Sequence, residues 1–155
     1  MDKFWLRQYQ PGVPAEIDIT QYRSLSHLLE ESFRKYADRK AYVCMDKAIT
    51  FRELDQMSQQ MGAWLQSRGL KQGARVAIMM PNVLQYPVAL AAALRAGYTV
   101  VNVNPLYTAR ELQHQLIDSG AEAIIVLENV AHTLAEVIAK TSVKHVVVAT
   151  MGDLL

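Results

Sequence analysis

Residues 75–80, Arg-Val-Ala-Ile-Met-Met, and residues 98–103, Tyr-Thr-Val-Val-Asn-Val, decide the fold. Both are short β-prone runs, and the uninterrupted apolar residues of the first are typical of a strand buried on both faces of a parallel sheet. The apolar segment between them predicts a helix that begins somewhere between residues 82 and 87 and ends near Arg95, with Gly97 behind it. A strand, a helix and a second strand in this order predict a βαβ unit with parallel strands.

The region from Val76 to Ala109 contains one charged residue, Arg95. We therefore expect this strand-helix-strand unit to be the most deeply buried part of the sheet. Residues 76–94 are free of charge, a length near the lower limit for crossing a bilayer. Prolines interrupt that stretch, so a buried strand, a loop and a buried helix explain it better than one membrane-spanning helix does.

The same alternation continues on both sides of the central unit. Thr50 stands three residues before Glu53, and Thr108 three residues before Glu111, a spacing typical of capping boxes that start helices. These two helices should end near Arg68 and at Gly120, respectively. The other expected elements are a helix that starts at Ser24 or Ser26, a hairpin of residues 41–45 and 48–51 with a turn at Asp46-Lys47, strands at 123–127 and 145–149, and a helix at 131–140.

The fold class that follows is α/β, with alternating strands and helices and a mostly parallel sheet. Residues 1–23 show neither a helical nor a strand period, and their Pro11, Gly12 and Pro14 favour an irregular N-terminal arm. Residues 24–155 form the α/β part, which we expect to continue beyond residue 155 in the native protein.

Composition excludes several function classes. The 155 residues carry a formal net charge of +1 without a long run of like charges, which argues against nucleic acid as a partner. Cys44 is the one cysteine, so no intrachain disulfide can form, and a reducing compartment is expected. The N-terminus has no apolar stretch of signal-peptide length, which favours a cytoplasmic protein.

The sequence lacks the motifs of known catalytic and metal sites. Its glycines form neither a dinucleotide-binding fingerprint nor a phosphate-binding loop. The four histidines are dispersed, one to each expected element, so we predict no metal site. Asn104 and Tyr107 follow a predicted buried strand, at the edge where open α/β sheets bind ligands, and are candidate substrate-binding residues. Asn and Pro are also ordinary turn formers, which is the alternative explanation of this loop.

The arm carries Phe4, Trp5 and Tyr9 beside Lys3 and Arg7. Aromatic and basic side chains together suit a membrane interface. Docking of the arm onto its own domain is the alternative.

Several strings resemble the acyl-adenylate-forming superfamily. Residues 49–54 (Ile-Thr-Phe-Arg-Glu-Leu) resemble its first core motif, and residues 94–98 (Leu-Arg-Ala-Gly-Tyr) resemble its second. Residues 81–87, 104–111 and 118–121 look specifically like bacterial long-chain fatty acid–CoA ligases, and so does the arm. The likeness covers the whole chain in the same order.

The resemblance implies the first part of the large N-terminal domain of a two-step ligase. In that family a fatty acid carboxylate attacks the α-phosphorus of Mg-ATP to give an acyl-adenylate, and CoA then displaces AMP. The matched residues are helix starts and stops, so the resemblance assigns no catalytic and no cofactor-binding residue here. The phosphate loop and the catalytic groups should follow Leu155, and we expect the chain alone to be inactive, with no bound cofactor.

Two other functions stay open. The chain could be a non-catalytic module of the same fold that binds a nucleotide or an acyl group. It could also be an interaction fragment whose sheet edge pairs with another copy. A homodimer and peripheral contact with the inner membrane are further partner alternatives.

Overall fold

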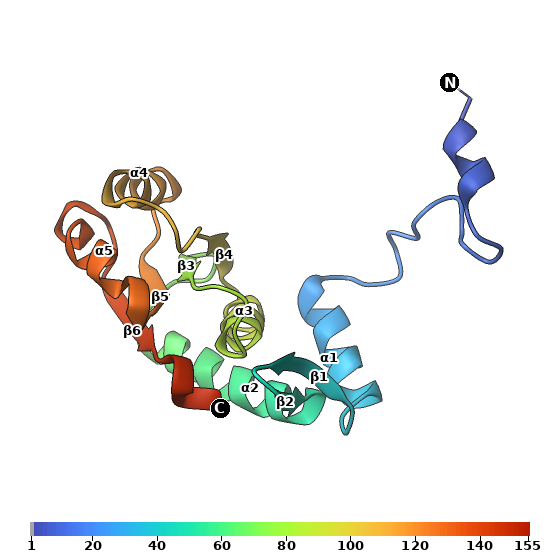
Figure 1. Cartoon of the computed structure of the whole chain (residues 1–155), viewed down its shortest axis with the longest axis horizontal. Coiled ribbons are helices and arrows are strands. Elements are labelled where there is room, and N and C mark those ends of the chain that lie inside the picture. Colours follow the sequence, from blue (N-terminus) through green and yellow to red (C-terminus); the bar gives the residue numbers. More distant parts are fainter. Residues whose placement is uncertain (1) are drawn as a thin grey trace.

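The computed structural model describes residues 2–155, and its centre is a four-stranded sheet of order β4-β3-β5-β6 (Figure 1). All three strand pairs are parallel, which confirms the predicted α/β class. The strands are β3 (Arg75–Met79), β4 (Thr99–Asn102), β5 (Ala123–Leu127) and β6 (His145–Ala149).

The most deeply buried strand differs from the expected one. All five residues of β5 are buried, whereas Thr99 and Asn102 of β4 are exposed. The prediction that both strands of the central βαβ unit are the most buried was therefore wrong for β4. The physical reason is strand order, because β4 is at one edge of the sheet and β5 lies between β3 and β6.

Helices cover both faces of the sheet, as the βαβ pattern requires. On one face, α3 (Gln85–Arg95) and α2 (Phe51–Ser67) pack against the side chains of Val76, Ile78 and Ile125. On the other face, α4 (Ala109–Ser119) and α5 (Ala131–Ala135) pack against Ala77, Met79, Ile124 and Val126. Figure 1 shows α3 and α4 on opposite sides of the strands.

Both predicted capping boxes are confirmed. The backbone N–H of Thr50 donates to the Glu53 carboxylate at 2.7 Å, and the Thr50 hydroxyl accepts from the Glu53 N–H at 3.2 Å. The Thr108–Glu111 pair has the same arrangement at 2.9 and 3.4 Å. Each box satisfies backbone groups that a helix N-terminus leaves free, which fixes where α2 and α4 begin.

The N-terminal part of the α/β region packs against α2 and α3. Helix α1 (Leu25–Lys35) starts at Ser24, whose hydroxyl accepts from the His27 N–H. Strands β1 (Lys40–Cys44) and β2 (Lys47–Thr50) form the predicted antiparallel hairpin. The turn lies at Met45-Asp46, with φ of 49° and 62°, and not at Asp46-Lys47 as predicted. Left-handed geometry at both central residues suits the twist of a two-residue hairpin turn.

The helix predicted at residues 131–140 is interrupted. It consists of α5 and the short 3₁₀ helix η3 (Ile138–Lys140). The break is at Val137, whose φ of −124° leaves helical geometry and whose side chain is 3% exposed in the core. Three further 3₁₀ turns are η1 (Phe4–Gln8), η2 (Glu128–Val130) and η4 (Met151–Leu154).

The arm extends away from the rest of the chain (Figure 1). It contains η1, so it is not irregular throughout. An ion pair between Lys3 and Glu16 joins the two ends of the segment that contains η1. Its aromatic residues are exposed, Phe4 at 69% and Trp5 at 41%. The structure therefore does not show docking of the arm onto the domain. Over residues 2–155, the structure has no helix with the length and apolarity that a bilayer crossing needs.

Candidate functional site

The carboxyl edge of the parallel sheet is the candidate functional site. The helices after β3 and after β5 cover opposite faces of the sheet, and β3 and β5 are neighbours. In open α/β sheets this topological switch point is where ligands bind, beyond the carboxyl ends of the strands. The loop after β3, η2 after β5 and the residues after β6 meet at this edge.

Gln85 ties two of these segments together. Its side chain, at the start of α3, donates from Nε2 to the Thr150 carbonyl oxygen at 2.7 Å. Gln85 is 9% exposed, an unusual burial for a polar side chain, and the hydrogen bond offsets the cost of that burial. Gln85 was not a sequence candidate, although a polar residue inside a long uncharged run was a usable signal.

The chain that leaves β6 is held at two more points. The Glu128 carboxylate accepts from the Met151 N–H at 3.2 Å. Thr150 and Asp153 form a third capping box at the start of η4, which was not predicted from the sequence. The hydroxyl and the N–H of Thr150 lower the pKa of the Asp153 carboxyl below its ordinary value of 3.8. The ends of β3, β5 and β6 are therefore joined through side chains.

Two side-chain hydrogen bonds hold the carboxyl end of β4. The Tyr86 hydroxyl donates to Asn102 Oδ1 at 2.9 Å, and Gln115 Nε2 donates to the Asn102 carbonyl oxygen at 2.9 Å. These bonds link α3 and α4 to the end of the edge strand. Neither Tyr86 nor Gln115 was a sequence candidate.

The structure brings the two sequence candidates, Asn104 and Tyr107, into one turn. Asn104 Oδ1 accepts from the Leu106 N–H at 3.0 Å, and the Asn104 carbonyl accepts from the Tyr107 N–H at 3.1 Å. The side-chain bond is an Asx turn, so Asn104 has a structural role in this loop. Tyr107 is half-buried and packs against the hydrophobic cluster that includes Leu112 and Leu116 of α4. It also lines a hollow of about 800 Å³.

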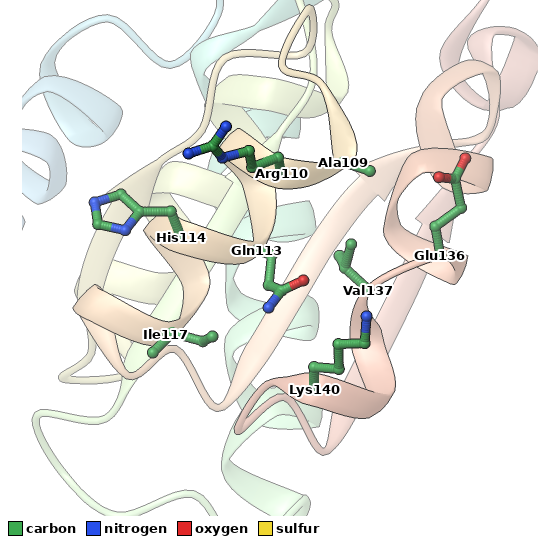
Figure 2. A pocket seen from close by; sticks show the side chains of 8 residues that line it. All are labelled: Ala109, Arg110, Gln113, His114, Ile117, Glu136, Val137 and Lys140. Atoms are coloured by element: carbon green, nitrogen blue, oxygen red, sulfur yellow. The ribbon is translucent and has the colours of Figure 1, made fainter.

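Two hollows flank α4. The one beside Tyr107 also touches Thr108, Arg110, Glu111 and His114. The other, about 430 Å³, lies between α4 and the α5–η3 segment, where Gln113 and Lys140 extend toward each other (Figure 2). Both are open surface depressions.

The charged Glu111 carboxylate at the start of α4 has a structural role. The N–H and then the hydroxyl of Thr108 lower the pKa of the Glu111 carboxyl below 4.5, which stabilises its charged form at the start of α4. Among residues 2–155, no group of three or more His, Cys, Asp or Glu side chains has an arrangement that could hold a metal ion. The arrangement positions loops around the carboxyl edge.

Comparisons with known proteins show the family to which this chain belongs. The AMP-binding enzyme family model matches residues 29–154. The long-chain-fatty-acid--CoA ligase of Salmonella typhimurium is 57% identical over the whole of this chain, which covers 28% of that protein. The ligase of the same name from Bacillus subtilis is 36% identical over 81% of this chain and 22% of its own length.

Solved structures agree with the fold. A long-chain-fatty-acid-CoA ligase from Archaeoglobus fulgidus matches 95% of this chain and 32% of its own, with a TM-score of 0.79 at 23% identity. A luciferase-like enzyme from the mealworm Zophobas morio matches 90% of this chain and 35% of its own, with a TM-score of 0.78 at 25% identity. The chain spans 28% of the length of the enterobacterial relatives it matches. It belongs to the AMP-binding enzyme family.

Proposed function

We propose that this chain is the N-terminal portion of a long-chain fatty acid–CoA ligase. The observation that carries the proposal is the 57% identity over all of its residues with a relative of that name. The complete protein would join a fatty acid to CoA with ATP, through an acyl-adenylate, and release AMP and pyrophosphate.

The role of this portion is to shape one wall of the site. Gln85, Glu128 and the Tyr86–Asn102 pair fix the loops at the carboxyl edge of the sheet. Such fixed loops hold a reacting ligand in one geometry, which is how positioning residues contribute to catalysis. Tyr107 and Asn104 belong to the same edge and are the substrate-binding residues proposed within this chain.

Mg-ATP and CoA would bind mainly outside this chain. Residues 2–155 offer no metal-binding cluster, and the sequence has no glycine-rich phosphate loop. We assign no reaction step to the present residues. Because they span 28% of the relatives' length, we propose that the 155 residues alone would not catalyse the reaction.

Fatty-acid-dependent ATP–pyrophosphate exchange tests the proposal. The complete protein should catalyse exchange with long-chain fatty acids, and the 155-residue chain should not. A folded complete protein that stays silent across acyl chain lengths would contradict the ligase assignment. Saturable ATP or acyl-adenylate binding by the 155-residue chain would favour a binding module.

We further propose a cytoplasmic location with peripheral contact to the inner membrane. The support is the arm, where Phe4 and Trp5 form an exposed edge-to-face pair near Lys3 and Arg7. Rings and basic groups together suit an anionic lipid surface. Co-sedimentation with anionic vesicles should fall when Phe4 and Trp5 are both replaced by Ser, and unchanged co-sedimentation would remove the arm as the contact. A homodimer stays a prediction that sedimentation velocity tests.

A further inference from the structure

The charged residues next to the central sheet differ between its two ends. The amino edge consists of Arg75, the first residue of β3, and the turns that lead into the four strands, residues 68–74, 96–98, 120–122 and 140–144. It carries five basic side chains and one acidic side chain, Glu122. At the carboxyl edge, the charged residues directly after the strands are Glu128 and Asp153. The sheet therefore has a basic amino edge and an acidic carboxyl edge.

Backbone hydrogen bonds join the turns of the amino edge into one row. The Gly73 N–H donates to the Gly97 carbonyl at 2.8 Å, which links the turns before β3 and β4. The Glu122 N–H donates to the Arg75 carbonyl at 2.9 Å, and the Lys144 N–H donates to the Glu122 carbonyl at 2.8 Å. All five basic residues of this edge are exposed. Their charges therefore act together on one side of the domain.

Two further contacts favour an anionic partner at the amino edge. The Glu122 carboxylate is 3.3 Å from Lys144 Nζ, so a cation already partners the acidic group. Trp64, near the end of α2, is 39% exposed, and the Arg68 guanidinium lies 5.0 Å from the centre of its ring. A tryptophan ring beside a cation suits the boundary between lipid headgroups and acyl chains.

The arm joins the domain at the same edge. Helix α3 starts beyond the carboxyl end of β3 and returns to the amino edge, where it ends at Arg95. The Ser26 hydroxyl donates to the Leu94 carbonyl at 3.1 Å, which places the start of α1 beside the end of α3. Because the arm directly precedes α1, its exposed Phe4 and Trp5 extend from the basic side of the sheet.

We propose that the amino edge of the sheet rests on an anionic lipid surface and that the carboxyl edge faces away from it. This inference rests on the proposed function, because a long-chain fatty acid partitions into lipid. An anionic surface attracts the amino edge and repels the carboxylates of Glu128 and Asp153, so charge sets the orientation. The candidate site then faces the water that contains ATP and CoA.

The surface fits lipid better than nucleic acid. Phe4, Trp5 and Trp64 are exposed apolar rings that a headgroup layer accommodates. The net charge of +1 over the chain is small for a protein that binds a phosphate backbone. Attraction to a lipid surface requires basic charge on the side that faces it, which the amino edge supplies.

Hydrogen exchange of the wild-type complete protein tests the orientation. Vesicles of equimolar phosphatidylglycerol and phosphatidylcholine should slow amide exchange in residues 69–73 at least about twofold, because the lipid covers that turn. Residues 103–107 at the carboxyl edge should keep their exchange rate, and vesicles of phosphatidylcholine alone should change neither segment. Equal slowing of both segments, or slowing confined to the arm, would overturn the proposal.

A matched pair of variants of the complete protein tests the charge. Lys71→Gln with Lys144→Gln removes two charges from the amino edge, and Lys40→Gln with Lys47→Gln removes two from the β1–β2 hairpin, which lies at the other end of α2. The first double variant should bind the anionic vesicles about 25-fold more weakly at low salt, or about fivefold for each lysine. The hairpin variant should bind like the wild type. Equal weakening of both variants, at wild-type Tm, would overturn the proposal.

Two other ligands of a basic edge are outcomes of the same experiment. Binding of RNA or duplex DNA that depends on Lys71 and Lys144, without binding of vesicles, would assign the edge to nucleic acid and overturn the proposal. Displacement of the vesicles by inorganic phosphate, but not by sodium chloride of equal ionic strength, would assign it to a soluble phosphate ligand and also overturn it.

These outcomes can be separated from the ligase assay. A protein that catalyses ATP–pyrophosphate exchange but binds vesicles equally well without Lys71 and Lys144 would keep the proposed function and lose this inference. A protein whose amino edge binds anionic vesicles but which has no exchange activity would keep the surface and lose the function.

Discussion

Arg95 at the end of α3 reaches Asp55 on α2, with its Nη1 2.6 Å from Oδ1 of the carboxylate. The same nitrogen donates to the Ser58 hydroxyl at 3.0 Å, and the guanidinium carbon lies 5.3 Å from the centre of the Phe33 ring. The Arg95 side chain is 16% exposed. The one charged residue of the central unit therefore joins α1, α2 and α3, and its role is structural.

Replacing Arg95 should destabilise the fold. Arg95→Met would leave the partly buried Asp55 without its cation and would remove the donor to the Ser58 hydroxyl, at a cost of about 2 kcal/mol. Urea unfolding measures the loss. Arg52→Met is the matched control, because its ion pair with Asp38 is exposed and such pairs contribute little. Equal effects of the two substitutions would contradict the structural role of Arg95.

The capping box of α4 predicts a second stability effect. Thr108→Ala removes the hydroxyl that accepts from the Glu111 N–H and should cost about 1 kcal/mol. Thr108→Ser retains an acceptor and should behave like the wild type in the same unfolding experiment. If Ala and Ser are equally stable, the cap does not contribute.

The same carboxylate predicts a pH dependence. Hydrogen bonds from Thr108 lower the pKa of Glu111 below 4.5 in the folded chain. A lowered carboxyl pKa adds stability that is present above the unfolded pKa and is lost as pH falls through the folded pKa. Unfolding free energy should therefore fall below about pH 5, and Glu53 and Asp153 act in the same direction through Thr50 and Thr150.

Glu111→Gln isolates this contribution. The variant should be less stable than the wild type at pH 7, and the difference should shrink as pH falls toward 3 because the wild-type carboxylate becomes protonated. Glu136→Gln is the control, since Glu136 is exposed and lies at the end of α5, outside any capping box. A Glu111→Gln difference that does not change with pH would argue against the shifted pKa.

The substrate-binding prediction for Tyr107 is tested by the loss of one hydroxyl. In the complete protein, Tyr107→Phe should leave Tm unchanged and raise KM for the fatty acid or ATP about fivefold, the equivalent of one hydrogen bond. Unchanged KM for both substrates would remove Tyr107 from the site.

Asn104 requires a different experiment because its side chain holds the turn. Asn104→Ala should lower stability by about 1 kcal/mol through loss of the bond to the Leu106 N–H, whereas Asn104→Asp retains an acceptor. A KM change in Asn104→Asp, at wild-type stability, would support substrate contact. Without it, Asn104 is a turn residue only.

The sequence predicted those features that depend on neighbours along the chain. The Thr50–Glu53 and Thr108–Glu111 boxes are local patterns, and both exist as predicted. The break at Val137 was missed because it depends on the burial of one side chain in the core. The burial of β4 was overestimated because strand order is a long-range property that composition does not encode.

The candidate site depends less on local sequence patterns than the fold does. Its place at the carboxyl edge follows from the βαβ pattern, and Asn104 and Tyr107 are in the predicted loop. The bonds that organise the edge join residues far apart, such as Gln85 with Thr150 and Tyr86 with Asn102. Such pairs could not be chosen from one sequence, because only the folded sheet brings them together.

The most direct test of the central claim is ATP–pyrophosphate exchange by the complete protein, measured with and without a long-chain fatty acid. The ligase assignment predicts exchange that requires the fatty acid, and none from residues 1–155 at equal concentration. A folded complete protein with no exchange at any acyl chain length, or fatty-acid-dependent exchange by residues 1–155 alone, would contradict it.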